Sequence, residues 1–371
     1  MHWTHRLLLV FFVAALLPGL PGCGSASPSG SAPPSLAAGY LDSCALARGA
    51  VQCWGWNRYG QLGNRSNVDS HTPVPVEGLT TGGRSIAAGH LHFCAVVNQV
   101  VQCWGYIGAD SQGQNLLTNV PLPIAGLTGS IPAIAAGYDS SCALDSGGVQ
   151  CWGWNTYGQL GTDAITDAPT PVSVAGLTTG VQGIAAGDYH VCAVVNGGVQ
   201  CWGYNSEGEL GNGSTADSPT PVAVTGLTAG VQSISARSFT TCAIVNGGVW
   251  CWGMGFGEST PVPVAGLSNG VQAVAVGGDH ACALTDGGVW CWGSNYYGQL
   301  GNDSSEDSAT PVPVAGLASG VEAISSGGSH SCAVFDGGVW CWGRNDFGQL
   351  GDDSLTNRPV PVQVVGLTTR P

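Results

Sequence analysis

The sequence contains no lysine and few charged residues of any kind. Its nine basic residues other than histidine are all arginine, and only 9% of the 371 residues are charged. Soluble domains usually carry about 25% charged residues. The formal net charge is −14. This excess of acid argues against binding to nucleic acid or anionic membranes, because both are bound by clustered Lys and Arg. We therefore expect a solvated acidic surface and no nucleic-acid partner.

Helical periodicity is also missing. No segment beyond the N-terminus repeats its apolar residues with a helical period over ten or more positions. The chain instead has 60 glycines and 21 prolines, which punctuate short apolar pieces such as "GVQCWG" and "TPVSVAG". This composition is typical of many short strands joined by tight turns. It predicts an all-β protein.

The N-terminus has the features of a secretory signal in residues 1–23. A weakly basic "MHWTHR" precedes eleven apolar residues, 7–17, too few to span a bilayer as a helix. The following "LPGC" resembles a bacterial lipoprotein signal, which would make Cys23 the lipidated residue. The alternative is an ordinary signal with a stray cysteine. Residues 24–35, rich in Gly, Ser and Pro, predict a flexible tether. We expect an exported protein that contacts a membrane only through Cys23.

The other fourteen cysteines form seven pairs, each with a spacing of nine. Zinc sites usually place two to four residues between paired cysteines, and export favours disulfides. Metal binding and reduced core cysteines are the alternatives to a disulfide in each pair. The pairs are Cys44 and Cys53, Cys94 and Cys103, Cys142 and Cys151, Cys192 and Cys201, Cys242 and Cys251, Cys282 and Cys291, and Cys332 and Cys341.

The residues between each pair predict a β-hairpin. Asn196-Gly197 and Asp286-Gly287 are typical of a two-residue turn in which both residues have positive φ. Counting outward from such a turn, Cys142 and Cys151 face each other at a non-hydrogen-bonded position. There the Cα atoms are about 4.5 Å apart, close enough for a disulfide.

The hairpins recur along the chain. The first cysteines of successive pairs are separated by 50, 48, 50, 50, 40 and 50 residues, a period typical of propeller blades. The pattern "IAAGxxHxCAL…GGVxCWGxNxxGQLG…PVPVxGL" resembles the repeat of the regulator of chromosome condensation family, in seven copies over residues 36–367. The resemblance implies a seven-bladed β-propeller over residues 36–371. The cysteine pairs resemble those of exported bacterial members.

The two ends of the repeat region predict how the ring closes. The last repeat ends at "VPVQVVGLTTRP", and the first begins with "SLAAG". We expect the N-terminal strand to join the last blade and close the ring, which removes exposed sheet edges.

Two repeats depart from the pattern. The second has "WGYIGADSQGQNLL", and the fifth has "CWGMGFGESTPVPV", ten residues short.

Catalysis finds little support in the motifs. Four histidines, His92, His190, His280 and His330, precede a hairpin cysteine by two residues, and Asp42, Ser140 and Thr240 take that position elsewhere. A residue that forms hydrogen bonds in a loop is the simplest interpretation, and a metal ring or a catalytic base is the alternative. Acidic loops such as "GNDSSEDS" are predicted to be solvated surface rather than calcium sites. We expect no enzyme activity, no cofactor and no metal.

Binding to a protein partner is the better-supported class, because propeller loops vary among similar blades. We expect a monomeric, non-catalytic scaffold. The family resemblance offers two alternatives: a secreted inhibitor like the propeller-type β-lactamase inhibitory protein, or a guanine-nucleotide exchange factor. The candidate partner-binding residues follow "AAG" and are Tyr40, His90, Tyr138, Asp188, Tyr189, Phe239 and Asp279. A second set follows "CWG" and includes Trp56, Tyr59, Tyr106, Trp154, Tyr157, Tyr204, Tyr296, Tyr297, Arg344 and Phe347.

Overall fold

The computed structural model describes residues 34–109, 114–255 and 258–369. The expected signal and Cys23 lie outside these residues. The expected tether also lies outside them except at its end, where Ser35 already belongs to the first strand. No described segment forms a helix with the length and apolar character needed to cross a bilayer.

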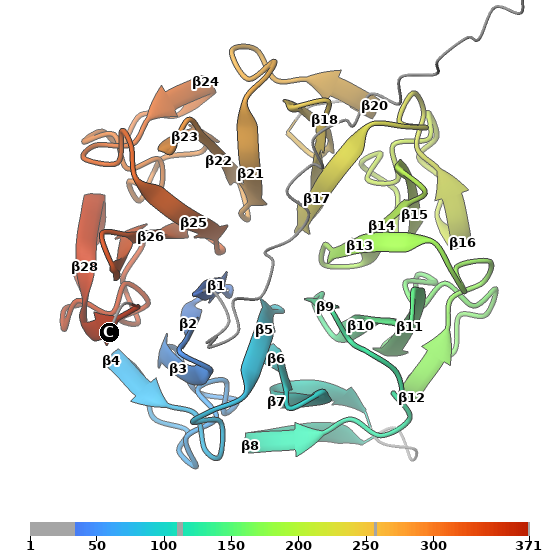
Figure 1. Ribbon diagram of the computed structural model, residues 1–371, viewed down its shortest axis with the longest axis horizontal. Coiled ribbons are helices and arrows are strands. Elements are labelled where there is room, and N and C mark those ends of the chain that lie inside the picture. Colours follow the sequence, from blue (N-terminus) through green and yellow to red (C-terminus); the bar gives the residue numbers. More distant parts are fainter. Residues whose placement is uncertain (1–33, 110–113, 256–257, 370–371) are drawn as a thin grey trace, which may run out of the picture. The chain divides into compact units, whose positions relative to one another are not determined.

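The described chain forms seven four-stranded antiparallel sheets, which follow one another as blades around a ring (Figure 1). This confirms the predicted all-β, seven-bladed propeller. The innermost strands are β1 (Ser35–Ala38), β5 (Gly83–Ala88), β9 (Ala133–Ala136), β13 (Val181–Ala186), β17 (Val231–Arg237), β21 (Val271–Val276) and β25 (Val321–Ser326). The second strands are β2 (Asp42–Ala47), β6 (His92–Val97), β10 (Ser140–Asp145), β14 (His190–Val195), β18 (Thr240–Val245), β22 (His280–Thr285) and β26 (His330–Phe335). The third strands are β3 (Ala50–Gly55), β7 (Val100–Ala109), β11 (Gly148–Gly153), β15 (Gly198–Gly203), β19 (Gly248–Gly253), β23 (Gly288–Gly293) and β27 (Gly338–Gly343). The outermost strands are β4 (Ser70–Pro75), β8 (Asn115–Pro123), β12 (Ala168–Ser173), β16 (Ser218–Ala223), β20 (Glu258–Pro263), β24 (Ser308–Pro313) and β28 (Arg358–Thr368).

The second and third strands of every blade are joined by the predicted two-residue turn. Asn196 and Gly197 have φ values of 50° and 81°, as a type I′ turn requires. The second blade keeps this geometry without glycine, since Asn98 and Gln99 have φ values of 50° and 69°. The turn is therefore set by the hairpin as a whole and not by glycine alone.

Each hairpin carries the disulfide that its spacing predicts. Cys142 pairs with Cys151 in the register of β10 and β11, and their Cα atoms are 4.0 Å apart. The other six pairs are joined in the same way, at Cα separations of 4.0–4.1 Å. All fourteen cysteines are therefore committed to bridges within their own blades.

The structure does not show the expected closure by an exchanged strand. β1 pairs with β2 in the first blade, with Ala37 opposite Cys44, and the last blade supplies its own inner strand, β25. The reason is local, because only residues 39–41 separate β1 from β2 and a short link favours antiparallel pairing of neighbours. Each repeat thus begins with its inner strand, and every blade is continuous in sequence.

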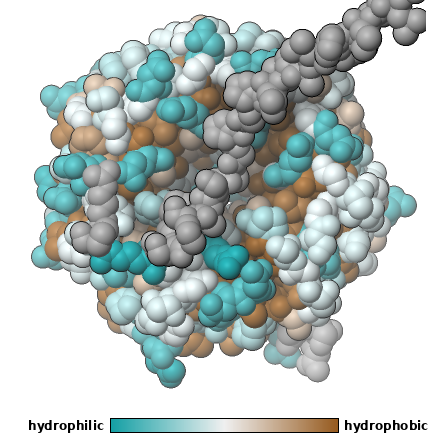
Figure 2. Space-filling model, viewed as in Figure 1, coloured by the Kyte–Doolittle hydropathy of each residue, from teal (hydrophilic) through white to brown (hydrophobic). Residues whose placement is uncertain are grey.

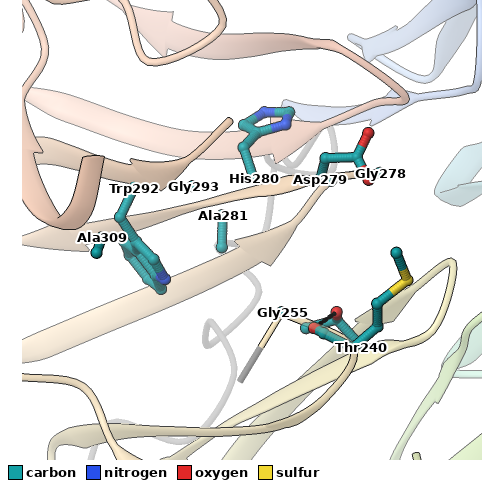
Figure 3. A pocket seen from close by; sticks show the side chains of 11 residues that line it. Thr240, Gly255, Gly278, Asp279, His280, Ala281, Trp292, Gly293 and Ala309 are labelled. Atoms are coloured by element: carbon teal, nitrogen blue, oxygen red, sulfur yellow. Dashed lines mark hydrogen bonds between the residues drawn. The ribbon is translucent and has the colours of Figure 1, made fainter. Parts of the chain in front are cut away.

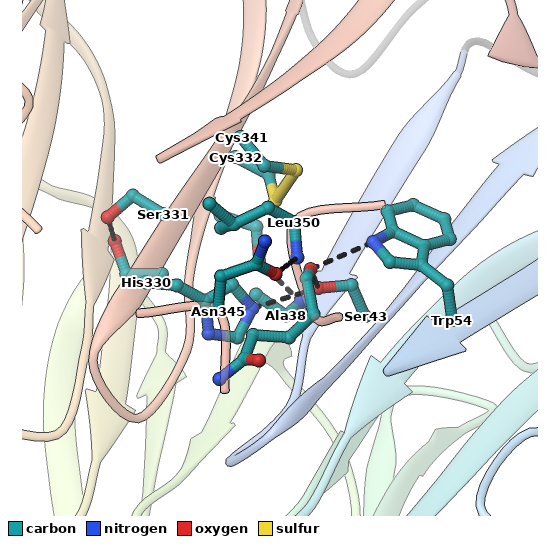
Figure 4. Close-up of a disulfide and its surroundings, with 12 residues drawn as sticks. Ala38, Ser43, Trp54, His330, Ser331, Cys332, Cys341, Asn345 and Leu350 are labelled. Atoms are coloured by element: carbon teal, nitrogen blue, oxygen red, sulfur yellow. Dashed lines mark hydrogen bonds between the residues drawn. A yellow bond between two sulfur atoms is a disulfide. The ribbon is translucent and has the colours of Figure 1, made fainter. Parts of the chain in front are cut away.

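The ring closes through side chains instead. The indole Nε1 of Trp54 in the first blade donates to the carbonyl oxygen of Gln349 in the last, at 2.8 Å. The Ser43 hydroxyl lies 2.8 Å from Nε2 of His330, and the Ala38 amide donates to the Ser325 hydroxyl at 3.0 Å. Figure 4 shows Trp54 and Ser43 directed at the last blade beside the Cys332–Cys341 disulfide.

The hydrophobic core is divided among the junctions between blades. At the closing junction Ala45 and Trp54 pack with Cys341, Leu350 and other buried residues of the last blade. The six other junctions have equivalent clusters. In the space-filling view, hydrophobic residues show between the hydrophilic loops (Figure 2). The tryptophans that follow the second cysteines are 0–3% exposed, as a packing role predicts.

Candidate binding face

The two predicted sets of loop residues lie on the same end of the blades. One set belongs to the loop between the first and second strands. The other belongs to the loop between the third and fourth strands, except Tyr106, which lies within the lengthened strand β7. Backbone hydrogen bonds join the loops within a blade: the Tyr204 amide donates to the Tyr189 carbonyl at 2.9 Å, and the Trp154 amide to the Asp139 carbonyl at 3.1 Å. The sequence did not reveal this shared face, because it depends on strand direction within the blade.

Seven rings from this face form one connected surface, the aromatic arc, across the first five blades. His90 lies between Tyr40 and Tyr138, with ring centroids 4.0 and 4.2 Å away. Tyr138 contacts Tyr189 at 5.3 Å, and Tyr189 contacts Phe239 at 6.3 Å. The arc also includes Tyr157 and Tyr204, which contact Tyr189 and each other.

The rings of the arc are neither core residues nor isolated surface side chains. Tyr40 is 37% exposed, and the others are half-buried against their neighbours. Such rings offer a large and rigid contact area. Five of the seven predicted partner-binding residues, Tyr40, His90, Tyr138, Tyr189 and Phe239, therefore come together.

The other two predicted partner-binding residues, Asp188 and Asp279, are not part of the aromatic arc. The Asp188 side chain is half-buried, and its backbone supports the arc because its carbonyl accepts from the Tyr138 amide at 2.9 Å. Asp279 is exposed in the sixth blade, where glycine and aspartate follow the inner strand instead of aromatic residues. The arc thus ends before the sixth blade.

Buried acids lie beside the arc. Burial raises the pKa of Asp139 to about 7, and the nearby Asp188 carboxylate adds to this shift. Burial also raises the pKa of Asp42 and of Asp188, while the positive charge of Arg237 opposes both shifts. The Arg237 guanidinium donates to the Ala38 carbonyl at 3.0 Å across the centre of the ring. The charge beneath the arc therefore changes near neutral pH.

His90 behaves as a neutral ring. Burial lowers its pKa to about 3, and the charges of Arg237 and His92 act in the same direction. A neutral imidazole can stack on Tyr138, from which its plane is tilted by 18°. Its place in the arc is that of an aromatic residue rather than of a cation.

The four histidines of the second strands join neighbouring blades. Nε2 of His92, His190, His280 and His330 lies 2.7–2.8 Å from a hydroxyl oxygen of the next blade, on Ser141, Thr241, Ser331 and Ser43 respectively. Burial lowers their pKa values to about 3 or, for His92, about 4, so all four are neutral at pH 7. This confirms the predicted hydrogen bonding, but the predicted place in a loop is wrong, because each histidine is the first residue of a second strand.

At this contact the residue types of neighbouring blades are complementary. Where a blade has histidine, the next has Ser or Thr. Where the histidine is replaced, the next blade has an apolar residue: Asp42 is followed by Phe93, Ser140 by Val191, and Thr240 by Ala281. A polar partner is therefore present only where the buried imidazole needs one.

A recurring contact within the loops between the third and fourth strands was missed from the sequence. In five repeats a buried asparagine after "CWG" organises a Gly-Gln-Leu-Gly loop, which is Gly-Glu-Leu-Gly in the fourth blade. The side-chain oxygen of Asn155, for example, accepts from the Leu160 amide at 2.9 Å, and the backbone amide of Asn155 donates to the Asp167 carboxylate at 2.8 Å. The acidic residue of this loop thus binds backbone. The recurrence of Asn57, Asn155, Asn205, Asn295 and Asn345 was the available signal.

The described residues contain no cluster of three or more His, Cys, Asp or Glu side chains arranged to hold a metal ion. The arrangement that remains is a rigid disulfide-bonded ring that presents an aromatic surface.

Comparison with known proteins gives a repeat family and a fold. The family profile "Regulator of chromosome condensation (RCC1) repeat" matches residues 48–96, 146–194, 196–244, 286–334 and 336–371. A second profile of that description matches residues 181–209, 271–299 and 321–349. The first profile leaves out residues 97–145 and 245–285, which contain the two departing loops. No curated protein sequence matched the chain.

Three solved structures illustrate the likeness in fold. Human WBSCR16 is 22% identical, with a TM-score of 0.75 over 85% of this chain and 94% of its own. Yeast RCC1 (Prp20), solved with Kap60, is 21% identical, with a TM-score of 0.52 over 89% of this chain and 74% of its own. The ectodomain of the Physcomitrella patens receptor kinase CR4 is 19% identical, with a TM-score of 0.53 over 84% of this chain and 73% of its own.

Proposed function

The chain belongs to the regulator of chromosome condensation repeat family, and on that premise we propose that it is a non-catalytic scaffold that binds another protein through the aromatic arc. The observation that carries this proposal is the connected row of half-exposed rings from Tyr40 to Phe239. Tyrosine and other aromatic residues are enriched at the energetic centres of protein interfaces.

The arc is also preorganised. Each ring already packs against at least one other, as Tyr157 does against Tyr204 at 4.9 Å. Binding then orders few additional side chains, which reduces the entropy cost of association. The backbone that carries the rings is held by loop-to-loop hydrogen bonds and by hairpin disulfides.

Relatives give a precedent for binding proteins. Yeast Prp20 is described as having binding properties to Gsp1p and histones, and it has been solved bound to Kap60. This supports a protein partner as a class and leaves its identity to experiment.

Alanine at both Tyr138 and Tyr189 tests the proposal. These rings lie at the middle of the arc, so their loss should weaken capture of the partner at least about 30-fold without unfolding the protein, since truncation of a single hot-spot residue already costs about 2 kcal/mol or more. The matched control is Tyr296→Ala, which removes a 76% exposed ring of the same face outside the arc. The measurement is quantitative cross-linking capture with the three proteins as baits.

A genuine partner is retained by the Tyr296→Ala variant and lost by the double variant. If every captured protein is retained equally by all three baits, the arc is not the binding surface. Circular dichroism of the double variant confirms that its fold is intact.

We also propose that the protein is exported and anchored through Cys23. Seven disulfides support an oxidising compartment, because cytosolic thiols are kept reduced. The Cys23→Ala variant should leave the membrane fraction for the soluble fraction in cell fractionation. Wild-type protein that is already soluble would contradict the anchor.

A further inference from the structure

The junction between the fifth and sixth blades lacks a contact that the chain makes at five other junctions. At those five junctions, a loop of one blade covers the tryptophan of the next blade. The leucines of these loops, Leu62, Leu160, Leu210, Leu300 and Leu350, are fully buried. The tryptophan Nε1 donates to the carbonyl of the residue before each leucine at 2.7–2.9 Å: Trp104 to Gln61, Trp202 to Gln159, Trp252 to Glu209, Trp342 to Gln299, and Trp54 to Gln349.

The fifth blade has lost this loop. Its chain from "CWG" to the outer strand is ten residues shorter than in the fourth blade, and it has neither the asparagine nor the Gly-Gln-Leu-Gly sequence. Trp292 of the sixth blade nevertheless stays 3% exposed. Its Nε1 is buried with no hydrogen-bond partner among the described residues. A buried indole N–H without an acceptor is unusual in a folded protein.

The second blade also lacks the loop, but there the chain provides a substitute. Ile107, on the lengthened strand β7, packs in the cluster that contains Trp152 of the next blade. The equivalent cluster around Trp292 contains no side chain from such a loop. Among the residues that the structure describes, the space is therefore filled at one departing junction and open at the other.

A pocket of about 330 Å³ lies where the fifth-blade loop is missing. We call it the junction pocket, and Thr240, Met254, Asp279, His280, Trp292 and Ala309 line it. Figure 3 shows the indole ring of Trp292 in its wall, with the nitrogen on the edge that faces Thr240 and Gly255. The volume is at the lower end of the range of about 300–1,000 Å³ that is typical of ligand pockets.

We propose that the junction pocket binds a peptide segment of a partner protein that reproduces the missing loop. A leucine side chain of that segment packs against Trp292, and the carbonyl before it accepts from Trp292 Nε1. The chain itself makes this pair of contacts five times, so the chemistry of the occupant is known from its own junctions. The exposed thioether of Met254 at the rim suits an adaptable apolar contact.

The pocket adjoins the aromatic arc. The Met254 amide donates to the carbonyl of Phe239, the last ring of the arc, at 2.9 Å. One partner can therefore cover the arc and insert a loop into the pocket. The inference does not rest on the arc, because the occupant is deduced from the five intact junctions.

The test uses the purified chain under non-reducing conditions and a fluorescent peptide that copies residues 294–308. This peptide keeps the residues that shape the loop internally, since Asn295 bonds both Asp307 and the Leu300 amide. We expect saturable binding in fluorescence anisotropy. A peptide with aspartate in place of Leu300 should bind at least about tenfold more weakly, because a charged side chain cannot enter an apolar site without a partner.

Two protein variants with matched controls sharpen the test. Trp292→Phe keeps a ring but removes the N–H, so peptide affinity should fall about tenfold. The control is Trp342→Phe, whose N–H is already bonded to Gln299, and it should leave affinity unchanged. Replacing residues 254–261 by residues 204–221 restores a loop and should abolish binding of the peptide.

The outcomes separate this inference from the function of the arc. The Tyr138→Ala variant should bind the peptide normally, even if it loses the partner. The junction-pocket proposal is overturned by absent saturable binding at millimolar peptide, by equal affinity for the two peptides, or by binding that survives insertion of the loop.

Discussion

The closing junction and the junction between the fifth and sixth blades are opposites in how they are held. No peptide link joins the last blade to the first. That junction nevertheless has both polar contacts of the repeat, the Trp54 indole on the Gln349 carbonyl and the Ser43 hydroxyl beside His330. The Ser43 hydroxyl also donates to the Gln349 carbonyl at 3.0 Å, which ties the two contacts together.

The junction between the fifth and sixth blades is continuous in sequence, from β20 to β21, but lacks both contacts among the described residues. Thr240 stands where four other blades have histidine, Ala281 stands where four other blades have Ser or Thr, and no described loop carbonyl accepts from Trp292 Nε1. The closing junction thus has the full set of contacts although no backbone link holds it, and the connected junctions at Trp252 and Trp342 have both contacts as well. The junction between the fifth and sixth blades keeps the inner-strand contact, in which the Val276 amide donates to the Ser235 hydroxyl at 3.1 Å. The junction pocket lies where the other two contacts are missing.

The largest effect should come from removing the histidine of the closing junction. His330 is fully buried, so His330→Ala loses a hydrogen bond and leaves a cavity; we expect the free energy of unfolding to fall by about 2–4 kcal/mol. Thr240→Ala removes the corresponding residue of the other junction, whose hydroxyl donates to the Met254 carbonyl and to no other described residue. We expect a loss of less than about 1 kcal/mol. Urea unfolding under non-reducing conditions measures both values.

Equal losses in the two variants would mean that the junctions are held equally well. The predicted difference between the junctions would also be wrong if the Thr240→Ala variant lost more free energy of unfolding than the His330→Ala variant. In either case the ring would not depend on the His330 contact for closure.

Acid should weaken the closing junction, as it should the three other junctions that contain a buried histidine. Burial lowers the pKa of His330 to about 3, with contributions from the charges of Arg237, His280 and Arg344. Since the unfolded chain titrates near pH 6.5, it binds more protons than the folded chain below that pH. The contribution of His330 to the free energy of unfolding is therefore complete above about pH 6.5. It is lost toward pH 3, at about 1.4 kcal/mol per pH unit.

The His330→Gln variant isolates this effect. Asp139 and Glu209 act in the opposite direction, because burial raises their pKa values to about 7 and favours the folded state as the pH falls from 7 toward 4. Both acids are present in wild type and variant alike, so their effects cancel in the comparison. The difference in the free energy of unfolding between the two proteins should shrink by about 2 kcal/mol from pH 6.5 to pH 5. A difference that stays constant with pH would show that His330 is not held neutral.

The hairpins could be predicted because their information is local. A spacing of nine between cysteines and an Asn-Gly or Asp-Gly turn determine both register and disulfide, as Cys192 and Cys201 show. The number of blades followed from the period. The strand that closes the ring was misplaced because the pattern alone does not show at which strand a repeat begins.

Contacts between blades were harder to predict, since they require knowledge of which side chains face each other. The pairing of His92 with Ser141 spans 49 residues and becomes visible only when neighbouring blades are compared at the right positions. The arc was found in part, through Tyr138 and Tyr189, but its extension through Tyr157 and Tyr204 depends on both loops sharing one face. The junction pocket was recognised only as a shortened loop.

The smallest effect should appear when the indole N–H is removed at each junction. Trp54→Phe breaks a 2.8 Å hydrogen bond to Gln349, whereas Trp292→Phe removes an N–H that has no partner among the described residues. Both variants lose similar ring area. We therefore expect Trp54→Phe to lower the free energy of unfolding by about 1 kcal/mol more than Trp292→Phe, which is the net value of one such bond. Urea unfolding of the two proteins gives the difference. Equal losses would mean that Trp292 finds an acceptor of equal strength in solution, and the junction pocket would then lack its free donor.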